Sequence, residues 1–121
     1  MNEMLIPMAQ DLEQLARELW TIGDITRLRI LQLLPHGPDC REGTHVSGIA
    51  ERLGLSQPTI SNHLARLRTL GLVRHTRMCR DVYYYIDREA GEAVIEHLRQ
   101  ALLPPEEQAA ATRPSENLSV T

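Results

Sequence analysis

The chain of 121 residues contains no phenylalanine and no lysine, and it has only one tryptophan and three tyrosines. Its hydrophobic fraction of 42% is still enough to bury a core, but that core must be aliphatic. An aliphatic core favours helices packed on helices, and a chain of this length accommodates one domain. The sequence therefore predicts a single, mainly α-helical domain.

Long hydrophobic runs are also missing. No segment approaches the roughly 20 apolar residues of a membrane span. The first residues, MNEMLIPMAQ, lack the basic start and small-residue cleavage site of a secretory signal. We therefore expect a cytoplasmic protein with no membrane partner. In that reducing compartment the two cysteines, Cys40 and Cys79, are expected to be free thiols.

Signatures of catalysis are absent as well. The sequence has no glycine-rich phosphate loop, no nucleophile elbow and no pair of carboxylates suited to a cleft. It therefore predicts a protein that is not an enzyme.

The net charge of −3 does not favour nucleic acid, but the charge is unevenly distributed. Residues 57–80 contain no acidic side chain and carry five arginines: Arg66, Arg68, Arg74, Arg77 and Arg80. A local cluster of positive charge attracts DNA phosphates whatever the net charge of the chain. An arginine-rich surface that contacts only solvent would give the same pattern, so the cluster by itself favours DNA only weakly.

Apolar spacing and turn residues predict five helices and one β-hairpin. Helices are expected over residues 8–20, 25–34, 47–53, 57–70 and 88–103, strands over 72–77 and 81–86, and a further short strand over 44–46. The second helix is expected to begin after Asp24 as its cap and to pack through Leu28, Leu31 and Leu34. Ser56 and Asp87 are likewise expected to cap the fourth and the last helix, and Gly71 is expected to end the fourth helix in the left-handed conformation.

These elements divide the chain into an N-terminal extension (residues 1–7), one domain (8–103) and a polar tail (104–121) that we expect to be disordered. Among the aromatic residues, Trp20 is expected in the core or at a subunit interface, and the three tyrosines at 83–85 are expected to pack the second strand of the hairpin.

The segment ERLGLSQPTISNHLARLRTLGLV has the form of a helix-turn-helix. In its second helix, Ile60, Leu64 and Leu67 form one apolar stripe, and polar residues occupy the opposite face. Short polar side chains near a helix N-terminus reach base edges in the major groove, and the arginine-rich hairpin that follows supports this use. The candidate DNA contacts are Ser56, Gln57, Thr59, Ser61, Asn62, His63, Arg66, Arg77 and Arg80.

Three stretches resemble the ArsR/SmtB family of metal- and stress-responsive repressors: TIGDITRLRILQLL, GLSQPTISNHLARLRTLGLV and RMCRDVYYYI. The resemblance covers about residues 12–102. It implies a winged helix-turn-helix fold, a homodimer that forms through the first and last helices, an inverted-repeat DNA operator, and repression relieved by an inducer, usually a metal or metalloid ion. The implied dimer contacts are Leu12, Leu15, Leu19, Val94, Leu98 and Leu102.

The usual inducer sites of that family cannot be carried over to this sequence. His45, Val46 and Ser47 stand where many members have a Cys-x-Cys pair, and the last helix lacks the Asp-x-His and His pattern of the second site. The remaining candidate ligands are His36, Cys40, His45 and Cys79.

Thiolate and imidazole suit Zn(II), or a softer ion where more sulfur is present. A thiol that binds a metalloid or senses an oxidant is expected to have a lowered pKa, and an arginine follows each cysteine. Two other functions stay open: a constitutive regulator with incidental cysteines, and a winged-helix module that binds another protein.

Overall fold

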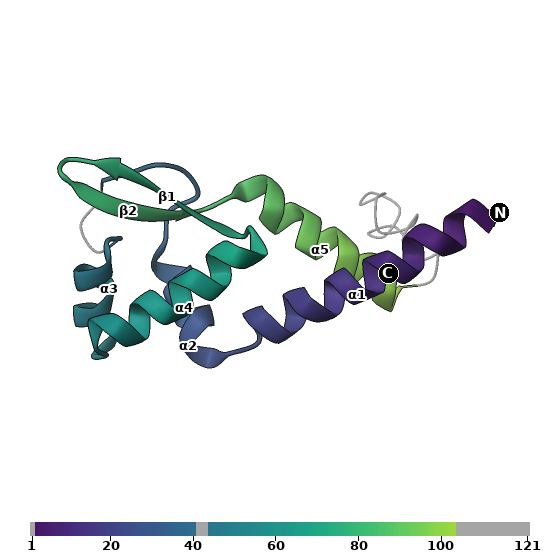
Figure 1. Cartoon of the computed structure of the whole chain (residues 1–121), viewed down its shortest axis with the longest axis horizontal. Coiled ribbons are helices and arrows are strands. Elements are labelled where there is room, and N and C mark those ends of the chain that lie inside the picture. The colour runs from purple at the N-terminus through teal and green to yellow at the C-terminus, as the bar shows by residue number, and fades with distance from the viewer. Residues whose placement is uncertain (1, 41–43, 104–121) are drawn as a thin grey trace, which may run out of the picture.

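The computed structural model describes residues 2–40 and 44–103, with side chains from residue 12 onward. Within these residues the chain forms five helices and one antiparallel hairpin. They are α1 (Asn2–Ile22), α2 (Ile25–Leu33), α3 (Val46–Leu53), α4 (Gln57–Leu70), β1 (Val73–Met78), β2 (Asp81–Ile86) and α5 (Arg88–Leu102). Helices α1 and α5 lie side by side at one end of the molecule, and the tip of the hairpin lies at the other end, beyond α3 (Figure 1). The expected fold class, helices with a small hairpin, is confirmed.

The first helix begins earlier than predicted. It starts at Asn2 rather than at residue 8, so it includes most of the segment that we set apart as an N-terminal extension. Glu3, Met4 and Leu5 are all good helix formers, and the helix continues through Pro7. The predicted tail, 104–121, lies outside the described residues.

The hydrophobic core is formed by the helix-turn-helix together with α2 and the start of β1. Its buried members are Ile30, Leu34, Ile49, Ala50, Ile60, Leu64, Leu67, Leu72 and Val73. The predicted face of α2 is only partly right. Ile30 is fully buried, whereas Leu28 is 42% exposed. Because α2 has only nine residues, its few contacts with α3 and α4 decide its face, and the apolar spacing alone left more than one choice.

Three helices begin at the predicted caps. Asp24 accepts a hydrogen bond from the Arg27 backbone N–H, Ser56 from Thr59, and Asp87 from Ala90. This hydrogen bond from Arg27 is the main cause of a lowered pKa at Asp24, because it stabilises the ionised carboxylate. Helix α4 ends at Gly71, whose φ of 91° is the left-handed conformation expected there.

The strand predicted over residues 44–46 does not form. Val46 already belongs to α3, and His45 is the N-cap of that helix. Thr44 is buried, and its carbonyl accepts one hydrogen bond, 3.1 Å long, from the Tyr84 N–H on the outer edge of β2. The backbone is thus extended and bonded to β2 at Thr44, but it enters helix α3 directly afterwards and forms no strand.

A candidate nucleic-acid interface

Helix α4 is fixed to the core by one face and exposes the other. Ile60 and Leu67 are 0% exposed and Leu64 is 1% exposed. The opposite face presents four predicted DNA contacts as exposed side chains: Gln57, Ser61, Asn62 and Arg66. A buried stripe of this kind holds the helix rigidly, so its polar face is presented in a defined orientation.

The other predicted residues of this helix have structural roles. The exposed Ser56 and the half-buried Thr59 hydrogen-bond each other through their hydroxyls at 2.8 Å, within the N-terminal cap. His63 is half-buried and turned towards α2, where its Nδ1 accepts a hydrogen bond from Arg27 Nε at 3.1 Å. The structure therefore separates His63 from the exposed face of α4.

Arg27 connects three helices near this face. Its Nη1 donates a 2.6 Å hydrogen bond to the Thr21 carbonyl in the last turn of α1, while its Nε donates to His63 on α4. Its own backbone belongs to the first turn of α2. A residue on α2 thus ties the end of α1 to the middle of α4. No local pattern indicates this role, because Arg27 lies 36 positions from His63 in the sequence.

The hairpin β1–β2 forms the wing. Arg77 and Arg80 are both exposed, and among the described residues neither forms an ion pair. Arg74, near the start of β1, lies 3.5 Å from the Asp87 carboxylate and is partly neutralised by it. The positive charge that is free to meet a phosphate therefore lies towards the tip of the wing.

The turn at the wing tip is unusual in its residues. Met78 pairs with Asp81, so the loop between the strands is only Cys79 and Arg80, with φ angles of 52° and 70°. A two-residue hairpin loop with two positive φ angles normally carries asparagine, aspartate or glycine, because other side chains are strained there. Cysteine and arginine occupy these positions at a conformational cost.

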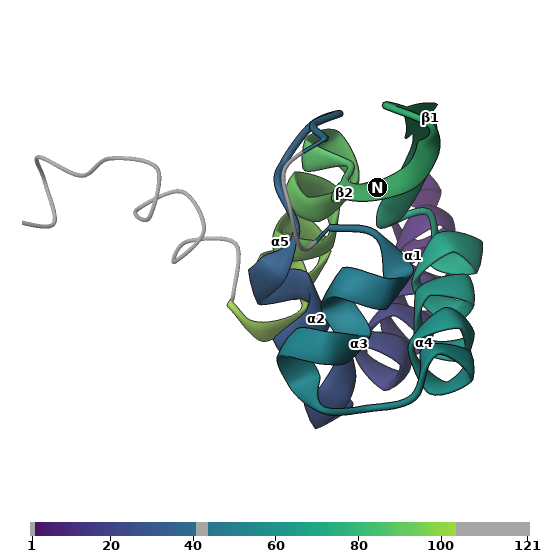
Figure 2. The same ribbon diagram turned by 90° about the vertical axis from the view of Figure 1, so that its left-hand side faces the viewer.

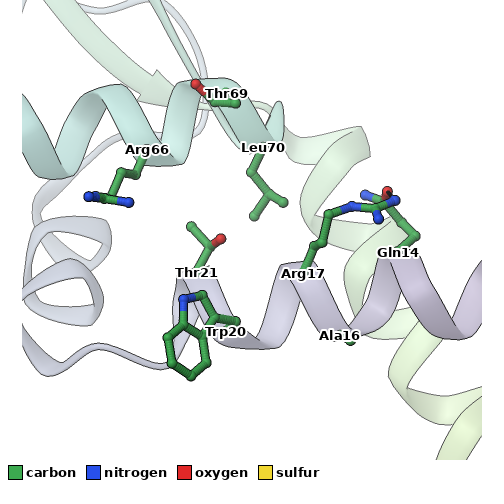
Figure 3. Close-up of a pocket in the computed structure, with 8 residues that line it drawn as sticks. All are labelled: Gln14, Ala16, Arg17, Trp20, Thr21, Arg66, Thr69 and Leu70. Atoms are coloured by element: carbon green, nitrogen blue, oxygen red, sulfur yellow. Dashed lines mark hydrogen bonds between the residues drawn. The ribbon is translucent and has the colours of Figure 1, made fainter.

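A groove of about 690 Å³ separates α4 from α1. Figure 3 shows Trp20 and Thr21 on the α1 side and Arg66, Thr69 and Leu70 on the α4 side. Trp20 is 85% exposed within one subunit, which excludes the core and leaves the subunit interface as the other expected place for it. Arg66 contributes to the α4 wall of this groove.

The four candidate metal ligands are not brought together. His36 lies beside Arg88 and Ile95, on the side of α5. His45 packs against the Tyr83 ring at 5.4 Å, and its buried Nδ1 has no hydrogen-bond partner among the described residues. Over residues 2–40 and 44–103 there is no group of three His, Cys, Asp or Glu side chains that is placed to hold an ion.

The two cysteines are both exposed free thiols. A side-chain hydrogen-bonding interaction with Cys40, followed by desolvation and by the charge interaction with Cys40, raises the pKa of Cys79. The lowered pKa that we expected beside Arg80 is therefore not found.

A buried hydrogen bond between a carboxylate and an imidazole joins α1 to α5, and the sequence does not predict it. Glu18 is only 4% exposed, and both of its carboxylate oxygens lie within 3.2 Å of His97 Nδ1. Gln14 adds a 3.1 Å hydrogen bond to the same carboxylate. One signal was available, because Glu18 follows the buried Leu15 by three positions and so lies on the inner face of α1.

The predicted dimer contacts differ in their exposure. Leu15 is 5% exposed and already packed within its own subunit. Leu12, Leu19 and Leu102 are 54%, 44% and 70% exposed, and Val94 and Leu98 are half-buried. Within the described residues, no helix is long and apolar enough to span a bilayer.

A rigid helix-turn-helix with an arginine-bearing hairpin beside it defines a winged helix-turn-helix protein. Residues 24–75 match the family described as "Bacterial regulatory protein, arsR family". The chain is 35% identical over 92 residues to the HTH-type transcriptional regulator YgaV of Escherichia coli strain K12, covering 76% of this chain and 89% of YgaV. The chain belongs to the ArsR family of bacterial regulatory proteins, and it is a transcriptional regulator rather than an enzyme.

Solved structures agree with this assignment. A predicted DNA-binding transcriptional regulator from E. coli is 33% identical, with a TM-score of 0.60 over 80% of this chain and 98% of that one. A homodimeric winged helix-turn-helix DNA-binding domain from Mycobacterium bovis is 29% identical, with a TM-score of 0.58 over 79% of this chain and 92% of that one.

Proposed function

We propose that the protein is a cytoplasmic homodimeric repressor, that it binds an inverted-repeat operator, and that a metal, metalloid or redox signal releases it. The observation that carries DNA recognition is the geometry of α4, whose apolar stripe is completely buried while Gln57, Ser61 and Asn62 are exposed. In this proposal these side chains read base edges in the major groove, and Arg77 and Arg80 of the wing contact phosphates.

The dimer is supported by the exposed apolar residues of α1 and α5. Helix α5 has no buried residue within one subunit, although its sequence is amphipathic. The solved relative from M. bovis is described as homodimeric. A two-fold dimer places two recognition helices in successive major grooves, which requires an operator with two-fold symmetry.

The inducer is proposed to act through the cysteines. Cys40 influences the pKa of Cys79, and the described residues hold no group of three candidate ligands, which favours a thiol-directed signal over zinc. Repression follows if the bound dimer blocks transcription, and release follows if the modified dimer binds DNA less tightly.

Operator selection tests the DNA-binding part of this proposal. The purified protein is used to select sequences from a random duplex pool, and fluorescence anisotropy then compares the selected duplex, one half-site and a random duplex. Asn62→Ala should weaken operator binding by about 1–3 kcal/mol and leave random-duplex binding unchanged, because a base contact is lost. Gln32→Ala, which truncates an exposed amide on α2, is the matched control.

Three outcomes would contradict the proposal. Selection of an asymmetric single half-site would exclude the two-fold operator. Equal losses on operator and random duplex would exclude base reading by Asn62. Absence of any salt-dependent DNA binding would leave a protein-interaction module. A reporter placed behind the selected operator then separates a repressor, which lowers expression, from an activator.

A further inference from the structure

The groove between α1 and α4 begins on the polar face of α4 that is proposed to read DNA. Asn62, Arg66 and Thr69 are all exposed and follow one another at helical spacing, which places them in one row along α4. Arg66 and Thr69 also line the groove. In Figure 2, α4 lies on one flank of the molecule and α1 lies behind it, while α2 and α5 lie towards the other flank. The groove therefore continues the proposed DNA surface from α4 towards α1.

The lining of the groove is positively charged. It contains Arg17 on α1 and Arg66 on α4, and none of the described residues that line it is acidic. Within the described part of the chain, neither guanidinium pairs with a carboxylate. Figure 3 shows Arg66 at one end of the groove and Arg17 at the other, with Thr21 and Leu70 between them. Two guanidinium groups without a neutralising acid in one groove select an anionic partner.

Arg17 is oriented from the interior of the subunit. Its Nη2 donates a 2.8 Å hydrogen bond to Gln14 Oε1, and Gln14 Nε2 donates at 3.1 Å to the Glu18 carboxylate. Glu18 is 4% exposed and is fixed in turn by His97 of α5. A side chain that is already held in place loses less conformational freedom when it meets a phosphate. The Arg17 guanidinium is thus prepared to bind an anion.

Trp20 adds a large apolar surface to the same groove. It is the only tryptophan of the chain, and it is 85% exposed within one subunit. At about 100° per residue, Arg17 lies about 140° around α1 from Leu12 and about 160° from Leu19. The exposed leucines of the proposed dimer therefore lie on the other side of α1 from Arg17. This geometry favours a partner other than the second subunit for the groove.

We propose that the groove between α1 and α4 is a second DNA contact surface, which seats the sugar–phosphate backbone of the operator beside each recognition helix. Arg17 and Arg66 contact its phosphates, and Trp20 packs against its deoxyribose rings. A backbone in which anionic and apolar groups alternate matches a groove that offers guanidinium groups and an indole. This inference rests on the proposed function, because it requires that α4 reads DNA.

The symmetry of the proposed dimer indicates which part of the operator reaches the groove. The two recognition helices enter successive major grooves, and the two copies of α1 lie between them. The backbone at the α1 wall is therefore the stretch between a half-site and the centre of the operator. Backbone contacts carry no base information directly, so they should strengthen binding to every duplex and leave the ranking of sequences unchanged.

The fluorescence of Trp20 tests the inference directly, because no other tryptophan contributes to the emission. The full chain is titrated with the neutral quencher acrylamide, alone and with the duplex that it selects from a random pool, and anisotropy confirms binding. We expect strong quenching of the free dimer and a loss of quenching on the duplex. Protection in the free dimer would assign the groove to the partner subunit. Unchanged quenching on a bound duplex would show that DNA does not reach it. Either result overturns the inference and leaves the proposed function standing.

Arg17→Gln removes one guanidinium from the groove and keeps a polar side chain. Affinity should fall about 8-fold at about 0.1 M salt on both the selected and a random duplex, and the slope of log K against log salt should become shallower by about one unit. Arg29→Gln removes an exposed arginine of α2 outside the groove and should leave the slope unchanged. Sedimentation velocity checks that both variants remain dimers.

A loss on the selected duplex alone, or equal slopes in the two variants, would overturn the phosphate contact by Arg17. If the wild type binds no duplex at any salt concentration, the proposed function fails, and this inference fails with it.

Discussion

Helices α4 and α5 have almost the same length and the same type of N-cap, yet α4 buries an apolar stripe and α5 buries no residue within one subunit. They contain 14 and 15 residues, and each begins with a side-chain cap, Ser56 or Asp87. Helix α4 buries Ile60, Leu64 and Leu67, whereas α5 buries no residue within one subunit. The difference lies in what each helix packs against, since one face of α4 packs against α1, α2, α3 and β1 and α5 contacts mainly α1.

Each subunit therefore completes the core around α4 on its own, whereas α1 and α5 keep apolar side chains exposed. In the proposed dimer, a second copy of α1 and α5 covers these side chains. Substitutions in the buried stripe of α4 should therefore act on the stability of each subunit, while substitutions of the exposed apolar residues of α1 and α5 should act on assembly.

The largest effect is expected from Leu64→Ala. Leu64 is 1% exposed in the centre of the core, so its truncation removes buried surface and leaves a cavity. The free energy of unfolding should fall by about 2–5 kcal/mol in urea denaturation. Ile25→Ala on α2, where the side chain is 59% exposed, is the control and should change stability little. A loss below about 1 kcal/mol at Leu64 would mean that α4 is not fixed as described.

Leu12→Glu should separate the subunits. Leu12 is 54% exposed on α1, and in the proposed dimer its replacement places a carboxylate in an apolar interface. The dissociation constant of the dimer should rise by at least about 30-fold, equivalent to about 2 kcal/mol, in sedimentation velocity. Ile25→Glu introduces the same charge at an equally exposed position on α2. Equal dissociation in both variants, or a monomeric wild type, would remove α1 from the interface.

His97→Ala should destabilise the subunit by about 1–3 kcal/mol, because it leaves the Glu18 carboxylate buried without its partner. The comparison variant is Glu96→Ala, which removes a half-exposed carboxylate that pairs with Arg99 on the surface of the same helix and should cost less than about 1 kcal/mol. Adding Glu18→Gln to His97→Ala should recover part of the lost stability in urea denaturation. No recovery in the double variant would show that His97 acts through packing alone.

The smallest effect concerns the reactivity of Cys79 towards iodoacetamide. Because its pKa is raised, its thiolate fraction increases only above the pH at which an ordinary thiol ionises, so alkylation should accelerate late in a pH series. Cys40→Ala removes the main cause of the raised pKa and should shift the alkylation profile to lower pH. Peptide mass spectrometry follows the rate at each pH. Identical profiles in wild type and variant would show that Cys40 does not raise the pKa of Cys79.

The sequence was informative where structure is local. The caps at Asp24, Ser56 and Asp87 and the left-handed Gly71 were predicted correctly, because each depends on residues at most a few positions away. The apolar stripe of α4 was correct as well, since 14 residues show the helical period clearly.

The sequence was less informative where distant segments meet. The hydrogen bonds between Glu18 and His97 and between Arg27 and His63 each join residues far apart in the chain. No local periodicity encodes them. The strand predicted over residues 44–46 was wrong for a related reason, because the environment of Thr44 includes the Tyr84 N–H of a strand 40 residues away.

In the proposed dimer, the hydrogen bonds of Arg27 constrain the spacing between the two half-sites of an operator. One guanidinium joins the last turn of α1 to His63, in the middle of α4. In the proposed dimer, α1 lies next to the two-fold axis and α4 lies against the DNA. The Arg27 side chain therefore fixes the orientation of the recognition helix relative to the dimer interface. The angle at which α1 meets its partner then sets the spacing between the two reading helices, and with it the number of base pairs that the operator must place between its half-sites.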